Sequence, residues 1–198
     1  NNSIATGLTK TGDGAMLMKG QNTYTGPTSI TDGSFMVNGS LASDVLINKD
    51  GILGGTGVVY GTTFVSGAVS PGPGRGILTT GAETWGGNGG FICNITGTNF
   101  EDSDMLQING ALDISATTQD PFTIKLVSFS SAMTPGPLSN FDTTHVCVWK
   151  IATASDGVPN WNADSLVVDA SGFMNDTSGG SFMVTPRGNL LLDRKSVL

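Results

Sequence analysis

Short runs in which apolar and polar residues alternate make up most of the chain as far as Gly81. Each run is three to five residues long and is bounded by Gly, Asn, Asp or Pro, which is the pattern of short β-strands separated by turns. Strands this short do not form stable isolated hairpins. The predicted strands are Ala15–Met18, Thr28–Ile30, Ser34–Val37, Val45–Ile47, Gly57–Tyr60, Thr63–Val65 and Gly76–Thr79.

Turn dipeptides recur along the same region. Asp13-Gly14, Asp32-Gly33 and Asp50-Gly51 are almost evenly spaced, and Ser66-Gly67 and Thr80-Gly81 continue the series at slightly shorter intervals. Several short strands in each period of about 18 residues fit the coil of a β-solenoid, in which every coil pairs in parallel with the coils above and below. The alternative, a sandwich of antiparallel hairpins, predicts longer strands and a turn roughly every 8–12 residues. The longer period favours the solenoid.

The pattern changes from about Trp85 onward. Pairs of adjacent apolar residues lengthen the predicted strands, and loops such as 130–141 interrupt them, so that the period is lost. The longer strands are expected at Gly90–Ile95, Asp104–Gly110, Ala111–Ile114, Pro121–Val127, Thr144–Ile151, Ser165–Asp169, Gly180–Thr185 and Gly188–Leu192.

The segment Leu8–Gly33 resembles the autotransporter-associated β-strand repeat, whose pattern runs L-x-K-x-G-x-G-x-L-x-L-x-G-x-N-T-Y-T-G-x-T-x-I-x-x-G. Gly51–Gly72 is similar to the companion pattern G-x-L-G-G-T-G-x-V followed by V-x-x-G-x-x-x-P-G. Together they cover roughly residues 7–80, and the resemblance implies a right-handed parallel β-helix stalk exported to the cell surface. Its most specific block is Asn22, Thr23, Tyr24, Thr25 and Gly26.

The second half resembles the C-terminal segment that follows such repeats in long surface proteins of environmental bacteria. The segment Ser103–Gly110 carries the Ser-Asp-x-Leu-x-x-x-Gly signature of that segment. We therefore expect residues 1–84 to form repeat coils, with corner glycines at Gly14, Gly33, Gly51 and Gly67, and residues 85–198 to form a longer-stranded continuation or cap of the same all-β solenoid.

Charge and composition exclude several classes of partner. With 16 acidic and 9 basic residues the chain has a net charge of −7, and no basic stripe is present to neutralise nucleic-acid phosphates or a negatively charged lipid surface. No apolar run approaches the roughly 20 residues that span a bilayer. Because the chain starts at Asn1 and not at Met, we expect an extracellular or cell-surface protein from which a signal peptide has been removed.

Two cysteines, Cys93 and Cys147, lie within predicted strands. They either form a disulfide in an oxidising compartment or act as two small buried apolar side chains. The sequence leaves both alternatives open, because it does not give the distance between them.

Candidate chemistry is sparse. The acidic run Glu101–Asp104 offers Asp102 and Asp104 as weak ligands for a hard cation, but no loop pattern completes a calcium site, and a solvated acidic loop is the favoured interpretation. His145 and Cys147 share a strand face, yet a catalytic pair also needs an orienting group and an electropositive setting. No phosphate loop, dinucleotide fingerprint or zinc-spaced set is found. We expect no enzyme activity, cofactor or metal.

Two functions of different classes remain. In the first, the chain is a structural subunit that stacks head to tail into a filament or surface layer, because neither terminus resembles a cap and Leu190–Leu192 is apolar. In the second, it is an adhesin or glycan-binding passenger fragment, and a polysaccharide lyase or hydrolase ranks third. A platform for stacking sugar rings would use the aromatic residues Tyr24, Tyr60, Trp85, Trp149 and Trp161.

Overall fold

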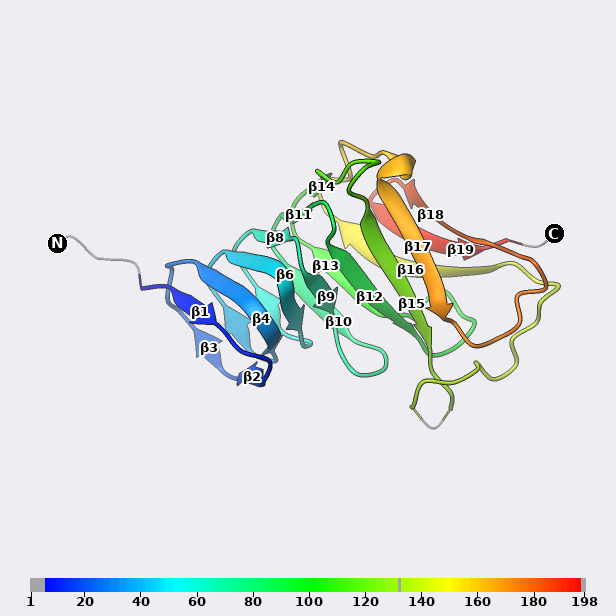
Figure 1. The fold of residues 1–198 in the computed structure, drawn as a ribbon, viewed down its shortest axis with the longest axis horizontal. Helices are drawn as coiled ribbons and strands as arrows, with labels where there is room; N and C mark the ends of the chain where they lie inside the picture. Colours follow the sequence, from blue (N-terminus) through cyan, green and yellow to red (C-terminus); the bar gives the residue numbers. More distant parts are fainter. Residues whose placement is uncertain (1–5, 132, 197–198) are drawn as a thin grey trace.

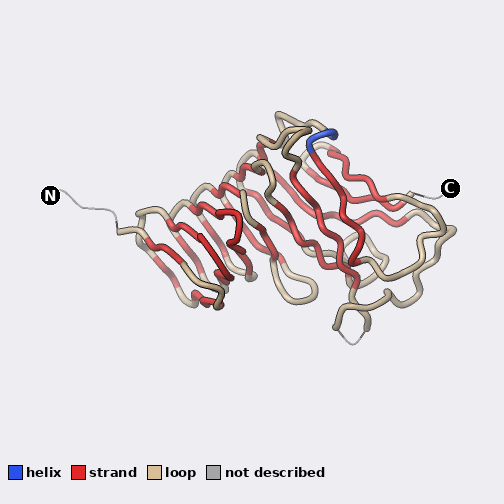
Figure 2. Tube along the Cα trace, in the orientation of Figure 1, coloured by secondary structure: helices blue, strands red, loops and turns tan. Residues whose placement is uncertain are grey.

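The computed structural model describes residues 6–131 and 133–196, and nearly all regular structure in them is β. The coils follow one another along the long axis of the molecule, with the N-terminal coils at one end and the C-terminal strands at the other (Figure 1). The one helical segment in the described ranges, the 3-10 turn Ala163–Ser165, lies near the C-terminal end (Figure 2). The predicted fold class, an all-β parallel β-helix, is confirmed.

Apart from the ten-residue strands β4 and β6, the strands of the first coils are shorter than most of the later ones. They are β1 Leu8–Lys10, β2 Ala15–Met18, β3 Gln21–Asn22, β4 Thr28–Val37, β5 Ser40–Leu41, β6 Val45–Gly54, β7 Val58–Val59, β8 Thr63–Val65, β9 Ala68–Ser70, β10 Ile77–Thr80, β11 Glu83–Trp85, β12 Gly90–Ile95, β13 Met105–Ile108, β14 Leu112–Ile114, β15 Phe122–Ser128, β16 Cys147–Ala154, β17 Leu166–Gly172, β18 Phe182–Arg187 and β19 Leu190–Lys195.

Three faces run along the solenoid, and their strands pair in parallel except where β19 joins β16 and β18. The first runs from β1 through the start of β4 and β6 to β8, β11 and β14; the second runs from β2 through the ends of β4 and β6 to β9, β12, β15 and β17. The third is the separate sheet β3-β5-β7-β10-β13-β16-β19-β18. The strands β4 and β6 are long because each contributes to two faces.

The corner glycines of the early coils lie in register. Asp32 is aligned with Asp50 and Gly33 with Gly51, so each of these coils takes up one repeat of the sequence. Thr80-Gly81 does not continue this column, because Gly81 donates to the carbonyl of Gly61 at another corner. The 71–76 loop lengthens the following coil, in which Gly90 is aligned with Ala68. The series of turns read from the sequence, with its decreasing intervals, therefore combined turns from two different corners of the coil.

Inward-facing side chains stack in columns that fill the solenoid. One column contains Phe35, Leu53, Val69, Phe91 and Ile124, all fully buried and aligned from coil to coil. In the wider C-terminal half, large aromatic rings fill the space, as where the rings of Trp85 and Phe122 stack with centroids 4.3 Å apart. The core runs without interruption across the predicted boundary at residues 84 and 85, and the division of the chain there stays a prediction.

The C-terminal end is covered, contrary to the expectation of an uncapped apolar terminus. The strands β18 and β19 form an antiparallel hairpin, and β19 pairs antiparallel with β16. Leu191 and Leu192 are buried by this pairing, and the Phe182 ring packs edge-on against Phe173. The apolar run Leu190–Leu192 is thus a core strand.

The N-terminal end is open. Within the described residues, β1, β2 and β3 each pair on one side only. Their inward side chains, Leu8, Met16, Met18 and Tyr24, are only partly buried, whereas the aligned Phe35 and Val37 of the next coil are fully buried.

Candidate functional site

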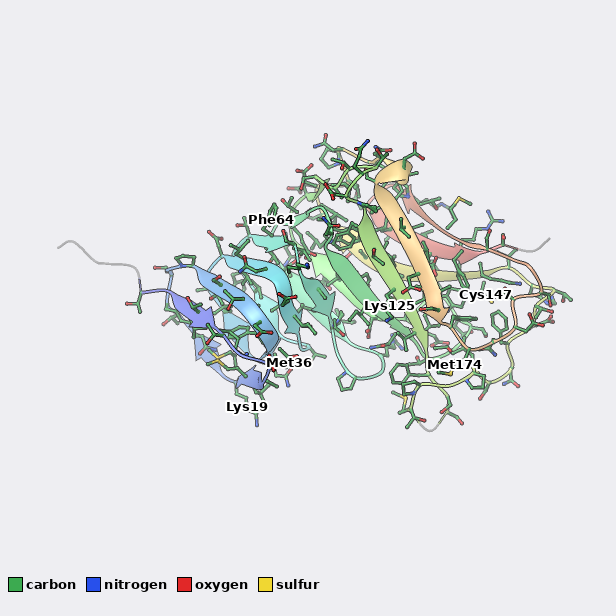
Figure 3. All side chains as sticks on the ribbon, in the orientation of Figure 1. Lys19, Met36, Phe64, Lys125, Cys147 and Met174 are labelled. Atoms are coloured by element: carbon green, nitrogen blue, oxygen red, sulfur yellow. The ribbon has the colours of Figure 1, made fainter. Side chains whose placement is uncertain are left out.

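A groove of about 510 Å³ crosses the outer side of the second face, perpendicular to the strands. Its lining residues come from successive coils, which are about 4.8 Å apart in a β-sheet. We call this the axial groove; Met36, one of its lining residues, lies on the face that also carries Lys125 (Figure 3). The lining residues are Ala15, Ser34, Met36, Ile52, Ser70, Gly72, Pro73, Ile92, Asn94 and Phe129.

The floor of the axial groove is apolar because several strands carry apolar residues on both faces. Met36 lies between the buried residues Phe35 and Val37, and Ile92 lies between Phe91 and Cys93. Met36 lies flat because its neighbour is Gly54: a Cβ atom there would be 2.7 Å from the Met36 Sδ atom. The signal for this groove, runs of three apolar residues in a β-strand, was present in the sequence but was used only to place strands.

The wall of the axial groove is the 71–76 loop, which a buried carboxylate fastens to β12. Asp104 Oδ1 accepts a hydrogen bond of 2.6 Å from the Gly76 backbone N–H. Asp104 Oδ2 accepts bonds from the Asn94 backbone N–H at 3.1 Å and from Asn94 Nδ2 at 2.7 Å. Asn94 Nδ2 also donates to the Gly72 carbonyl at 2.7 Å. Two side chains thus hold both ends of the loop.

The surroundings of Asp104 have two opposite effects on the pKa of its carboxyl group. Burial raises the pKa of the carboxyl to about 7, while the hydrogen bonds from Gly76 and Asn94 act to lower it. Three N–H groups converge on the two oxygens, an arrangement that favours the ionised carboxylate and opposes the effect of burial.

The two weak metal candidates serve different structural roles. Asp102 Oδ2 accepts bonds from the backbone N–H and Nδ2 of Asn99, which forms a surface turn, whereas Asp104 points inward to Asn94 and Gly76. Among the described residues no group of three or more His, Cys, Asp or Glu side chains is arranged to hold a metal ion.

His145 and Cys147 line a small hollow of about 220 Å³ together with Asp142. His145 Nδ1 lies 2.7 Å from Asp142 Oδ2, so an orienting group is present, but the His145 side chain is 76% exposed. Burial raises the pKa of the Cys147 thiol, against an opposing effect of Lys195. A thiol with a raised pKa is a poor nucleophile at neutral pH.

The cysteines do not pair in the structure: Cys93 and Cys147 are both free and buried. Burial, together with the charges of Asp104 and Asp193, raises the pKa of Cys93 well above its usual value. The sequence left open a disulfide or two buried small side chains, and in the structure the cysteines are two buried small side chains.

The repeat block Asn22–Gly26 joins the first coil to the second. Asn22 Nδ2 donates to the Ser40 carbonyl at 3.0 Å, and the Tyr24 hydroxyl lies 2.7 Å from Thr28 Oγ1, which in turn lies 2.6 Å from Ser43 Oγ. Thr23 and Thr25 are exposed. The most specific block of the motif is therefore a structural connector between coils.

The aromatic residues that a platform for sugar rings would use do not gather at the surface. Trp85 and Trp149 are fully buried, Tyr24 and Trp161 are partly buried, and only Tyr60, at 68% exposure, is largely free. The rings of Trp85 and Trp149 fill the core because the later coils enclose a wider space.

The fold defines a class, the parallel β-helix, and comparisons with known proteins narrow it. Residues 8–36 match the family model described as the Passenger-associated-transport-repeat. This match confirms the resemblance to the autotransporter-associated repeat seen in Leu8–Gly33.

Curated relatives carry similar segments. The chain is 45% identical over 73 residues to an extracellular serine protease of Serratia marcescens, a match that covers 36% of this chain and 7% of that protein. It is 39% identical over 75 residues to the adhesin BmaC autotransporter of Brucella suis biovar 1 (strain 1330), covering 35% of this chain and 2% of the relative. The chain thus spans less than a tenth of the length of these relatives. No helix in the described part of the chain is long and apolar enough to cross a membrane.

Proposed function

We propose that this chain is a non-catalytic structural segment of a secreted or surface-exposed bacterial passenger, and that it associates by accepting a further parallel coil on its N-terminal edge. The passenger-type repeat and the names of the relatives support the setting. The open space next to the first corner glycine, Gly14, supports the association.

Corner glycines in this solenoid are needed because the preceding coil passes close to them. A Cβ atom at Gly33 would clash with the backbone of Gly12–Gly14, and one at Gly51 would clash with the Ile30 carbonyl. Gly14 occupies the same column in the first coil, yet a Cβ atom there would meet nothing within 4 Å, and its backbone φ is not positive. A coil stacked on the N-terminal edge would give Gly14 the close contact that the other corner glycines have.

The backbone of the same edge is ready for pairing. The carbonyls of Gly14 and Met18 accept bonds from β4 and the residue after it, so the N–H and C=O groups of Ala15 and Leu17 point to the open side. Unpaired groups of this kind favour the addition of another strand.

A second copy of the chain would donate that coil from its C-terminal end, where both edge strands run in the required direction. The two edges are not level, however: β17 ends the second face one strand beyond β15, whereas β18 ends the third sheet two strands beyond β16. At the N-terminal edge the first strands of both sheets lie in the same coil, so this edge would pair with either β17 or β18 but not with both at once. We therefore expect weak, concentration-dependent association, with short head-to-tail assemblies at high concentration.

Two variants test this proposal while leaving the fold of the monomer intact. Gly14→Ala fills the space that a stacked coil would occupy, and Leu17→Pro removes an N–H that faces the open side. Leu17→Ala, which keeps the N–H, is the matched control. Sedimentation velocity over a concentration series should show association of the wild type and of Leu17→Ala, and loss of association for the other two. A wild-type chain that stays monomeric at the highest concentration would rule out self-stacking.

An adhesive function is the second candidate, and it is favoured by the axial groove together with the relative named an adhesin. A glycan array separates the two functions: specific binding by the monomer supports the adhesin, and association without binding supports the structural segment. A screen for lyase, glycosidase and protease turnover tests the proposal that the chain is non-catalytic.

A further inference from the structure

A second hollow of about 220 Å³ adjoins the axial groove on the same face of the solenoid. Both are lined by Ile92, so they meet at that side chain. We call the second one the lysine hollow, because two lysines, Lys49 and Lys125, are among its lining residues. The small residues Gly67, Ala68 and Gly90 make it concave.

The two hollows differ in chemistry. The axial groove is lined by uncharged residues, with aliphatic side chains such as Ile52 and Ile92 along its floor and Pro73 in its wall. Arg75 lies in the wall but is not among the lining residues, and the carboxylate of Asp104 behind the wall is buried and accepts three N–H donors. An apolar chain in this groove would therefore meet no uncompensated charge.

The lysine hollow is positive within an acidic protein. The Lys49 side chain is exposed and has no hydrogen-bond or ion-pair partner among residues 6–131 and 133–196. Lys125 is aligned with Asp169 on β17. That carboxyl is held first by Ser171, whose hydroxyl and backbone N–H lower its pKa, and Lys125 lowers it further. The Lys125 ammonium is thus only partly neutralised, and an anion between the two lysines would gain a favourable field.

We propose that the two hollows form one binding site for a single-chain anionic amphiphile, with the hydrocarbon chain in the axial groove and a phosphate or carboxylate head between Lys49 and Lys125. The overall charge of −7 disfavours a negatively charged lipid surface. A single molecule feels the local field instead, because charges beyond roughly 10 Å are screened at ordinary salt. The site does not depend on self-stacking, which uses the N-terminal edge.

Three ligands that share parts of this chemistry test the site. Dodecyl phosphate has both the chain and the anionic head, dodecyl maltoside has the same chain with a neutral head, and inorganic phosphate has the head alone. Calorimetric titration below the critical micelle concentration should show saturable binding of dodecyl phosphate, roughly tenfold tighter than that of the maltoside, and none of inorganic phosphate. Far-UV circular dichroism of each complex checks that the fold persists.

Matched variants assign the two parts of the ligand. Ile92→Asp should abolish binding of both dodecyl compounds, while Leu46→Asp, an exposed position on another face, should leave it unchanged. The double variant Lys49→Glu with Lys125→Glu should remove the preference for the phosphate head, and Arg187→Glu with Arg194→Glu should not. Absence of saturable dodecyl phosphate binding, or binding that survives Ile92→Asp, overturns the proposal.

Discussion

At the scale of single residues, the polar groups inside the solenoid are hydrogen-bonded with few exceptions. Asn94 shows why this matters, since its side chain donates both to Asp104 and to the Gly72 carbonyl from a buried position. A buried acceptor that loses its donor costs far more than the same acceptor in water.

The first prediction compares two asparagines that each donate to an aspartate at 2.7 Å. Asn94 donates to Asp104 in the interior and Asn99 to Asp102 at the surface. Asn94→Ala should lower the free energy of unfolding by about 2–4 kcal/mol, whereas Asn99→Ala should lower it by less than about 1 kcal/mol. Urea denaturation of both variants measures the difference, and similar losses would show that the anchoring of the 71–76 loop is unimportant.

The second prediction concerns the corner glycines. Gly51→Ala places a methyl group against the Ile30 backbone and should destabilise the fold by about 1–3 kcal/mol. Gly14→Ala meets no atom and should leave the thermal midpoint almost unchanged. If both variants were equally stable, the coils would be separated by more space than the structure has.

At the scale of elements, the C-terminal hairpin replaces a further coil. Its strands cover the open end of the last coil and bring Phe182 to a cluster with Trp149 and Phe173. The hairpin therefore completes the core at this side of the described chain.

The third prediction follows from that cover. A chain ending at Gly180 lacks β18 and β19 and exposes Trp149, so it should bind a hydrophobic dye and unfold over a broad urea range. A chain ending at Ser196 keeps both strands and is the control. Removal of the hairpin without change in the unfolding transition would mean that the coils alone complete the core.

At the scale of the whole molecule, the sequence predicted the first half of the fold better than the second. In the first coils each coil contains one sequence repeat, so the spacing of the Asp-Gly turns is enough to predict that Asp32 is aligned with Asp50. Later loops destroy the period: Leu106 is aligned with Ala152, although several loops and strands separate them along the chain. The groove was missed because Met36 and Ile92 look like core residues, and the anchoring carboxylate because its partners are distant or lie in other elements.

The last prediction concerns pH and rests on three buried carboxyls. Burial raises the pKa values of Glu83, Asp104 and Asp193 to about 7 in the folded state. The unfolded chain releases these protons near pH 4, so between about pH 4 and pH 7 the folded state binds more protons. The stability contributed by these groups is complete below about pH 4 and is lost as the pH rises through 7.

The expected slope is on the order of 1 kcal/mol per pH unit for each group. The exposed Asp142 works in the opposite sense, because hydrogen bonds from Thr144 lower its pKa to about 2, and its contribution is lost only in stronger acid. Urea titrations at pH 5 and pH 8 should therefore show greater stability at pH 5. Burial dominates at Asp193, where a backbone hydrogen bond from Arg194 acts to lower the pKa. Asp193→Asn should accordingly reduce the dependence of the unfolding free energy on pH by the contribution of one carboxyl group. A protein that is more stable at pH 8 than at pH 5 would contradict the raised pKa values of the three buried carboxyls.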